Sequence, residues 1–225
     1  MRKLILIAAC FSSTMGMAQS QGYDGNLGVT IGMGIPQQGY ADTLGRNMFT
    51  FGAHLALPAR RIPFQFGFVF DYGIMGRKTS KITVTDPLLQ KSEGRFALTE
   101  KVLSYHPMLR FNPFKGDVRP YVEGMVGLRH FSTKSNITVD GMGEPVQRER
   151  HSDDMVFSSG WAAGMMVKVG GSGYIEARVE RMYSGEAEYV NPHSITVDSQ
   201  GNVSFSTLKS HTGTLNLLVG AGFLF

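Results

Sequence analysis

Large apolar residues alternate with small or polar residues along most of the chain. In the first such segment, Leu27, Val29 and Ile31 alternate with Gly28 and Thr30. A period of two is typical of a β-strand with one apolar face. The pattern recurs in eight segments, which we expect to be strands: 27–35, 49–57, 64–72, 103–111, 122–129, 157–168, 175–180 and 214–225.

The connections between these segments alternate strictly between short and long. The short ones are 58–63, 112–118 and 170–173, and the long ones are 36–46, 76–92, 140–154 and 185–210. Up-and-down membrane barrels have an even number of strands, short periplasmic turns and longer extracellular loops. This organisation predicts both chain termini on the periplasmic side.

The alternation alone does not say which face points inward, so a soluble barrel of the lipocalin type is the competing interpretation. The segments offer roughly five large apolar side chains each, more than the interior of an eight-stranded barrel can hold. The opposite face is mostly Gly, Ala, Ser and Thr with a few charges, which suits a crowded interior. We therefore expect an all-β fold, an eight-stranded antiparallel up-and-down transmembrane β-barrel with its large apolar face in lipid.

The first residues read as a secretory signal peptide. Met1-Arg2-Lys3 is followed by the apolar run 4–11 and by small residues up to Ala18, so we expect a signal peptide over 1–18 and an outer-membrane β-barrel domain over 19–225. A lipoprotein signal ending at Cys10 is the alternative, although few residues precede that cysteine. Cys10 is the only cysteine, so cleavage after Ala18 excludes disulfides and thiolate chemistry from the mature chain. The net charge of +4 falls to +2 without Arg2 and Lys3 and gives no indication of nucleic acid binding.

The final segment, Leu215–Phe225, resembles the closing strand of bacterial outer-membrane barrels. That resemblance implies an assembly signal read by the barrel-assembly machinery and carried by Val219, Ala221, Phe223 and Phe225. The alternative is that the last two phenylalanines belong to the aromatic girdle at the membrane interface.

Over about 200 residues the organisation resembles the OmpA/OmpX-like group of small barrels in Gram-negative cell envelopes. The Ala18-Gln19 junction and the segment Arg119-Pro120-Tyr121-Val122-Glu123-Gly124 resemble Bacteroidetes-type members of the outer-membrane β-barrel, or porin, group. The resemblance implies a location in the outer membrane. Because the sequence stops at the closing strand, we expect no peptidoglycan-binding domain after the barrel.

The inward face carries a balanced set of charges. Its residues are Asp71, Arg110, Glu123, Arg129, Lys168, Glu176, Arg178 and Glu180. Unpaired charges are costly in a low-dielectric interior, so we expect a salt-bridged network that fills the barrel. The alternative is a gated, narrow pore for small solutes, similar to OmpW-type barrels.

The long connections contain a repeated β-branched triplet. Ile82-Thr83-Val84, Ile137-Thr138-Val139 and Ile195-Thr196-Val197 each lie in or beside a predicted loop. Such triplets favour strands, and a protruding sheet edge can pair with an extended partner strand. The alternative is ordered loop hairpins without a partner. The second long connection also carries Arg77, Lys78, Lys81, Lys91 and Arg95, which suit the phosphates of lipopolysaccharide.

One constellation loosely resembles the lipid A deacylases, which are eight-stranded barrels. His130 and Ser132 share the lipid-facing side of one segment, and Glu144 follows in the next connection. The resemblance implies a serine esterase in which His130 activates Ser132. It departs from the family at Thr133, where an Asn is expected, and in the spacing to Arg129. The histidines lack metal-ligand spacing, and we expect neither a metal nor a cofactor.

The sequence thus favours an outer-membrane barrel with a structural or surface-interaction role, in adhesion or envelope stability. Its expected partners are membrane lipid or lipopolysaccharide, the assembly machinery and an extracellular protein that contacts the loops. A solute pore and a lipid A esterase are the alternatives.

Overall fold

A computed structural model describes residues 23–37, 39–59, 61–86, 90–139, 147–190, 194, 196–197, 203–204 and 206–225. The expected signal peptide lies outside the described residues. Eight strands form one closed antiparallel barrel: β1 (Asn26–Pro36), β2 (Met48–Pro58), β3 (Phe64–Asp86), β4 (Gln90–Phe111), β5 (Val118–Val139), β6 (Gln147–Lys168), β7 (Gly173–Ser184) and β12 (Thr214–Leu224). The predicted fold class and strand count are confirmed.

Each barrel strand pairs with its neighbours in the sequence, and β12 pairs with β1 to close the ring. Two further hydrogen bonds extend this seam: Gly25 N–H donates to the Phe225 carbonyl at 2.7 Å, and Phe225 N–H donates to the Gly25 carbonyl at 3.0 Å. Closure leaves no unpaired edge in the barrel wall, the condition for a sheet to cross a membrane. Among the described helices, none is long and apolar enough to cross a membrane.

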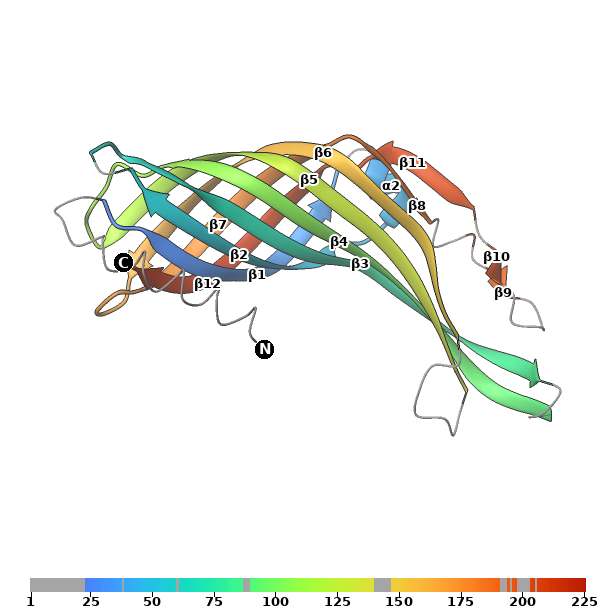
Figure 1. The fold of residues 1–225 in the computed structure, drawn as a ribbon. Helices are drawn as coiled ribbons and strands as arrows, with labels where there is room; N and C mark the ends of the chain where they lie inside the picture. The colour runs from blue at the N-terminus through green and yellow to red at the C-terminus, as the bar shows by residue number, and fades with distance from the viewer. Residues whose placement is uncertain are drawn as a thin grey trace, which may run out of the picture.

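The two ends of the barrel differ. The short connections 59–63, 112–117 and 169–172 lie at one end, here called the turn end, together with the C-terminus (Figure 1). The opposite loop end carries the helix α2 (Gly39–Leu44) and the hairpin of β8 (Glu186–Val190) with β11 (Thr207–His211). A second small hairpin pairs β9 (Thr196–Val197) with β10 (Val203–Ser204).

Four strands are much longer than the apolar alternation predicts, as the hypothesis drawn from the β-branched triplets expects. β3 to β6 run on past the barrel and form a four-stranded extension at the loop end, here called the protruding sheet (Figure 1). The predicted loops 76–92 and 140–154 are therefore wrong, because all their described residues, 76–86, 90–92 and 147–154, are strand. The alternation of apolar and polar residues ends where these strands leave the barrel, so it does not reveal the extension.

Two β-bulges mark the place where the protruding sheet leaves the barrel. Met75 is the extra residue between the Ile74–Lys101 and Gly76–Glu100 pairs of β3 and β4. The register also shifts between β5 and β6, immediately after Thr133. Bulges bend a strand and increase its twist, which lets the sheet diverge from the closed ring.

Candidate functional site

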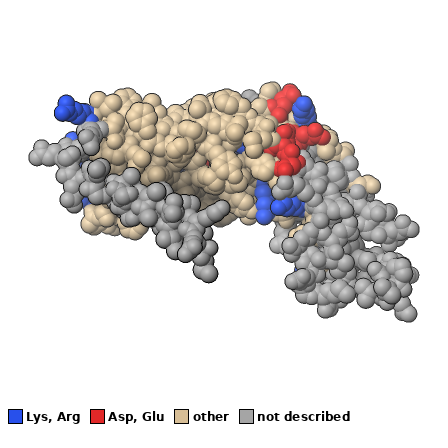
Figure 2. Space-filling model, in the orientation of Figure 1, with Lys and Arg blue, Asp and Glu red and all other residues tan. Residues whose placement is uncertain are grey.

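On the face seen in Figure 2, the charged side chains lie towards the two ends of the barrel, and the exposed side chains between them are mostly large and apolar. Phe68 of β3 and Phe223 of β12, three strands apart around the ring, each expose 64% of their surface. The other outward aromatic residues include Phe49, Phe51, Phe66, Phe70, Phe157 and Trp161. A continuous belt of this kind is unstable in water and fits the hydrocarbon of a bilayer. The chain is a transmembrane barrel.

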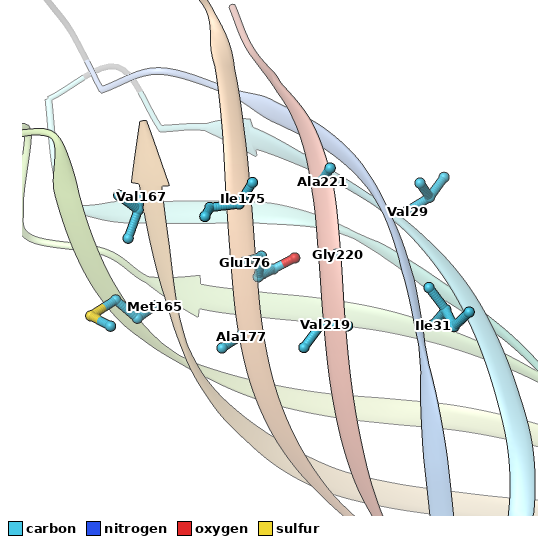
Figure 3. Close-up of a pocket in the computed structure, with 10 residues that line it drawn as sticks. All are labelled: Val29, Ile31, Met165, Val167, Ile175, Glu176, Ala177, Val219, Gly220 and Ala221. Atoms are coloured by element: carbon cyan, nitrogen blue, oxygen red, sulfur yellow. The ribbon is translucent and has the colours of Figure 1, made fainter. Parts of the chain in front are cut away.

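Small outward side chains leave a shallow groove in this belt, across β1, β12, β7 and β6 (Figure 3). Ala177 and Ala221 lie between the larger Ile31, Met165 and Ile175. Its outward-facing side chains are apolar, so the groove offers shape to an acyl chain but no polar group for chemistry.

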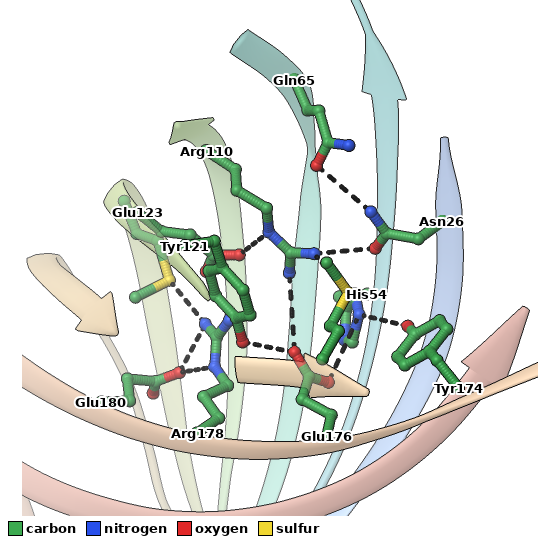
Figure 4. A network of polar contacts seen from close by, with 12 residues as sticks. Asn26, His54, Gln65, Arg110, Tyr121, Glu123, Tyr174, Glu176, Arg178 and Glu180 are labelled. Atoms are coloured by element: carbon green, nitrogen blue, oxygen red, sulfur yellow. Dashed lines mark hydrogen bonds and ion pairs between the residues drawn. The ribbon is translucent and has the colours of Figure 1, made fainter. Parts of the chain in front are cut away.

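The interior holds a connected network of buried polar side chains (Figure 4). Glu123 bridges two arginines, accepting from Arg110 Nε and from Arg178 Nη1. Arg178 also donates to Glu180 at 3.0 Å, and Glu180 accepts from the Asn216 amide at 2.8 Å. This group joins strands β4, β5, β7 and β12 across the barrel.

A second branch extends the network towards the turn end and β1. Arg110 Nη1 donates to the Asn26 side-chain oxygen at 2.8 Å, and Asn26 donates in turn to Gln65 at 3.2 Å. On the other side, Tyr121 donates its hydroxyl proton to Glu176. His54 lies 3.0 Å from the Tyr174 hydroxyl.

The buried charges show that the interior is filled at this level. The side chains of Arg110, Glu123, Arg178 and Glu180 are each at most 1% exposed. A lumen wide enough for water would leave the side chains that line it accessible. Each of these charges is instead covered and paired, as a low-dielectric interior requires.

The structure brings seven of the eight predicted interior charges inside. Asp71 and Arg129 are buried with the others, on the loop-end side, where they line one small enclosed cavity with Thr50 and Asn216. Arg129 donates to the Thr212 carbonyl at 2.6 Å and so ties the base of the β8–β11 hairpin to the barrel wall. Lys168 is the exception: it is exposed at the end of β6, because its strand ends there.

Several uncharged or neutral members of the network were not predicted. They are Asn26, His54, Gln65, Tyr121 and Tyr174, and His106 forms a separate buried pair with Ser158. All have the inward parity of their strands, so parity alone places them inside. Their partners depend on ring closure; His54 and Tyr174, for example, are 120 residues apart.

A hydrophobic cluster covers the network at the loop end. Tyr40 of α2 is fully buried, points its hydroxyl at Met75 Sδ, and packs edge-on against Phe131 with ring centroids 6.5 Å apart. The cluster, here called the plug, comprises Tyr40, Met48, Met75, Val102, Phe131, Val156 and Ala187. Met75 continues the inward parity of Asp71 and Gly73 on β3, and α2 and β8 lie at the loop-end mouth of the barrel (Figure 1).

The hypothetical esterase residues are only partly described. His130 and Ser132 lie on the outward side of β5, and the carboxylate that contacts His130 Nε2 is Asp153 of β6. The Ser132 hydroxyl has no hydrogen-bond partner among the described residues. Glu144 lies outside the described residues. The described part of the chain also holds no group of side chains that could bind a metal.

The β-branched triplets lie in different elements of the structure. Ile82–Val84 lies in the outer part of β3 and Ile137–Val139 ends β5, so both belong to the protruding sheet. Thr196–Val197 forms β9 of the small hairpin, and Ile195 lies outside the described residues. Arg77, Lys78, Lys81, Lys91 and Arg95 stand on β3 and β4 rather than in a loop.

The closing strand presents its apolar residues to lipid. Val219, Ala221 and Phe223 are exposed on the outward side of β12, and Phe225 follows them at the seam.

A scan against protein-family models found no match, and a search of curated proteins found none either. Among solved structures the chain is similar to Ail, the attachment invasion locus protein of Yersinia pestis, solved in complex with the heparin analogue sucrose octasulfate (15% identity, TM-score 0.47, 91% of this chain and 100% of that one). It is also similar to Neisserial surface protein A (15%, 0.47, 91% and 98%) and to a major outer membrane protein from Thermus thermophilus (12%, 0.49, 89% and 99%). Similarities at these identities and TM-scores carry no argument about function. The strand pairing of this chain establishes the barrel.

Proposed function

We propose that the chain is an integral outer-membrane barrel with the turn end in the periplasm, and that it presents the protruding sheet as an interaction surface outside the cell. The observation that carries this proposal is the length of β3 to β6. Among the described strands, β3 pairs only with β4 from Gly76 to Asp86, because β2 already ends its pairing at Ile74. This stretch of β3 is an open edge of unpaired backbone groups, which can accept an extended partner strand.

The interior supports a structural and binding role rather than solute transport. The ion-paired layer around Glu123 and the plug around Tyr40 lie one above the other along the same barrel. A solute would have to displace both. The narrow-pore alternative therefore has no supporting feature in the described residues.

Cations at the loop-end border of the apolar belt support contact with anionic lipid. Lys101 lies over the Tyr72 ring at 5.6 Å, and Arg181 lies over the Tyr183 ring at 5.2 Å. Both face outward at the level where the headgroups of a bilayer begin. We propose that the phosphates of lipopolysaccharide are their counter-charges.

The barrel-assembly machinery is the partner proposed for the closing strand. Val219, Ala221, Phe223 and Phe225 form an apolar edge beside the seam with β1. Their alternation on the lipid-facing side is the feature that such a machine can read from an extended chain.

The location and the binding role are tested separately. The location predicts heat-modifiable migration of the outer-membrane fraction on gels, and recovery from the soluble periplasm alone would refute it. The binding role is tested by replacing Thr79–Ala97 with Asn-Gly, a favoured two-residue hairpin turn, between the paired residues Lys78 and Leu98.

Cells displaying equal amounts of the full and shortened barrels are compared for adhesion to immobilised matrix proteins and to one another. We expect the shortened barrel to fold and to lose adhesion. Unchanged adhesion would remove the role of the open β3 edge while leaving the membrane barrel intact.

A further inference from the structure

Glu100 is a buried carboxylate at the mouth of the barrel. It lies on the inward side of β4, is 1% exposed, and neither carboxylate oxygen has a hydrogen-bond partner among the described residues. By contrast, Glu123 and Glu180 deeper in the barrel are paired with arginines. A charge left alone in such a place is costly.

Glu100 stands one layer beyond the plug, above the membrane belt. Its outward neighbour Lys101 marks the end of the apolar exterior of β4. Its cross-strand partners are Gly76 on β3 and Thr133 on β5, neither of which carries a charge. Val102, two residues further down β4 on the same face, belongs to the plug.

The segment that carries α2 packs beside Glu100, because Tyr40 contacts Met75 and Phe131, which lie next to Gly76 and two residues before Thr133. Tyr40 enters the plug from this segment, and Arg46 follows the helix. Burial raises the pKa of Glu100 from 4.5 to about 7, and the positive charge of Arg46 opposes part of that rise. Arg46 itself is exposed, so it moderates the cost of ionising Glu100 without removing it.

We propose that the segment 39–46 is a proton-controlled cap, seated on the barrel mouth while Glu100 is protonated and released when Glu100 ionises. With the cap seated, Glu100 is neutral and its burial is tolerated. With the cap released, water reaches the carboxylate and ionisation carries no penalty. The cap is the moving part, and the paired layer around Glu123 stays in place.

The direction of the pH dependence follows from the raised pKa. The seated state holds the proton more tightly than the released state, so it is favoured at low pH and loses stability as the pH rises from about 4.5 to about 7. A pKa difference of this size between the two states changes the ratio of released to seated molecules by about a hundredfold between these pH values. Above pH 7 the ratio levels off.

Two plug methionines provide a direct readout. Met48 and Met75 are 2% and 1% exposed beneath Tyr40, whereas Met155 is 57% exposed on the outward side of β6. Hydrogen peroxide converts accessible methionine to the sulfoxide. The full-length barrel, folded in lipid vesicles, is treated with peroxide from pH 5 to pH 8.5, and oxidation at each methionine is followed by peptide mass spectrometry relative to Met155.

We expect oxidation of Met48 and Met75 to accelerate by at least tenfold as the pH rises, while Met125, which contacts Arg178 of the paired layer at 3.4 Å, stays protected. Glu100→Gln should keep both methionines protected at every pH. Arg46→Gln should make release at high pH more complete, because the favourable charge is lost. Asp117→Asn, at an exposed carboxylate of the turn end, is the matched control and should behave like the wild type.

Tyr40→Ala shows that the assay detects an open mouth, since it should expose Met48 and Met75 at all pH values. The proposal is overturned if wild-type protection is independent of pH while Tyr40→Ala is oxidised. It is equally overturned if Glu100→Gln retains the pH dependence of the wild type. Protection of Met125 in every variant verifies that the barrel remains folded.

Discussion

Arg110 and Glu123 are direct cross-strand partners on β4 and β5, and their side chains form an ion pair with no exposed surface inside the barrel. Glu123 also accepts from Arg178, so one carboxylate holds two guanidinium groups. This shared carboxylate of β5 connects β4 with β7. Its loss leaves two buried cations without their main partner.

Glu123→Gln should therefore destabilise the barrel by about 3–5 kcal/mol, the range found when one partner of a buried ion pair is removed. Urea unfolding in lipid vesicles, followed by the fluorescence of the single tryptophan Trp161, measures the change. Asp24→Asn is the control: Asp24 pairs with Arg119 at 2.7 Å but is 45% exposed, so its loss should cost less than about 1 kcal/mol. Equal losses in the two variants would show that the interior network does not contribute as argued.

Inward-facing glycines make room for the side chains of the network. Alanine substitutions at one inward and one outward glycine on adjacent strands test this. A Cβ at Gly164 would collide with the ring and hydroxyl of Tyr121, which Glu176 holds by a hydrogen bond. Gly164→Ala should destabilise the barrel by about 1–3 kcal/mol, as overpacking does. Gly124 faces outward with nothing within 4 Å of an added Cβ, so Gly124→Ala should change stability by less than about 0.5 kcal/mol in the same unfolding experiment. The reverse order would contradict the assignment of the two faces.

The barrel could be predicted from the sequence because one physical constraint acts on every residue of its wall. Each strand residue faces either lipid or a crowded interior, so β1 and β12 alternate from end to end. Beyond the membrane that constraint disappears. The run from Arg77 to Lys81 is polar on both faces of β3 and therefore looks like a loop in the sequence.

The specific contacts of the interior could not be predicted for a different reason. Parity places Asp71 and Arg129 inside, but their neighbours depend on barrel closure and on the segments that cover the mouth. Tyr40 shows the same limit, because a residue in a long connection has no periodic signal to place it in the plug. Lys168 has inward parity, but its strand ends at that residue and leaves it exposed.

The filled interior predicts that the protein does not conduct ions. The wild type in a planar bilayer should give no unitary current steps, because the Arg110, Glu123 and Arg178 layer leaves no accessible lumen. Tyr40→Ala should also remain silent, since it opens only the mouth above that layer. Correct folding of both samples is verified by heat-modifiable migration. Regular single-channel steps from the wild type would favour the solute pore instead.

If the closing strand carries an assembly signal, a change in that signal should lower assembly in cells without lowering the stability of the barrel in lipid. Phe225 bonds to Gly25 through its backbone N–H and carbonyl, so Phe225→Ala preserves both seam hydrogen bonds. The variant should fold in lipid vesicles with a stability within about 1 kcal/mol of the wild type. In cells it should accumulate less assembled barrel, because an assembly machine that reads the aromatic side chain no longer recognises it.

Phe66→Ala is the matched control, since Phe66 is a lipid-facing aromatic near the turn end on β3, away from the closing strand. If Phe225 acts as an assembly signal, only Phe225→Ala lowers the amount of assembled barrel in the outer-membrane fraction. If both variants lower it equally, Phe225 acts as one member of the aromatic girdle, and the recognition role is withdrawn.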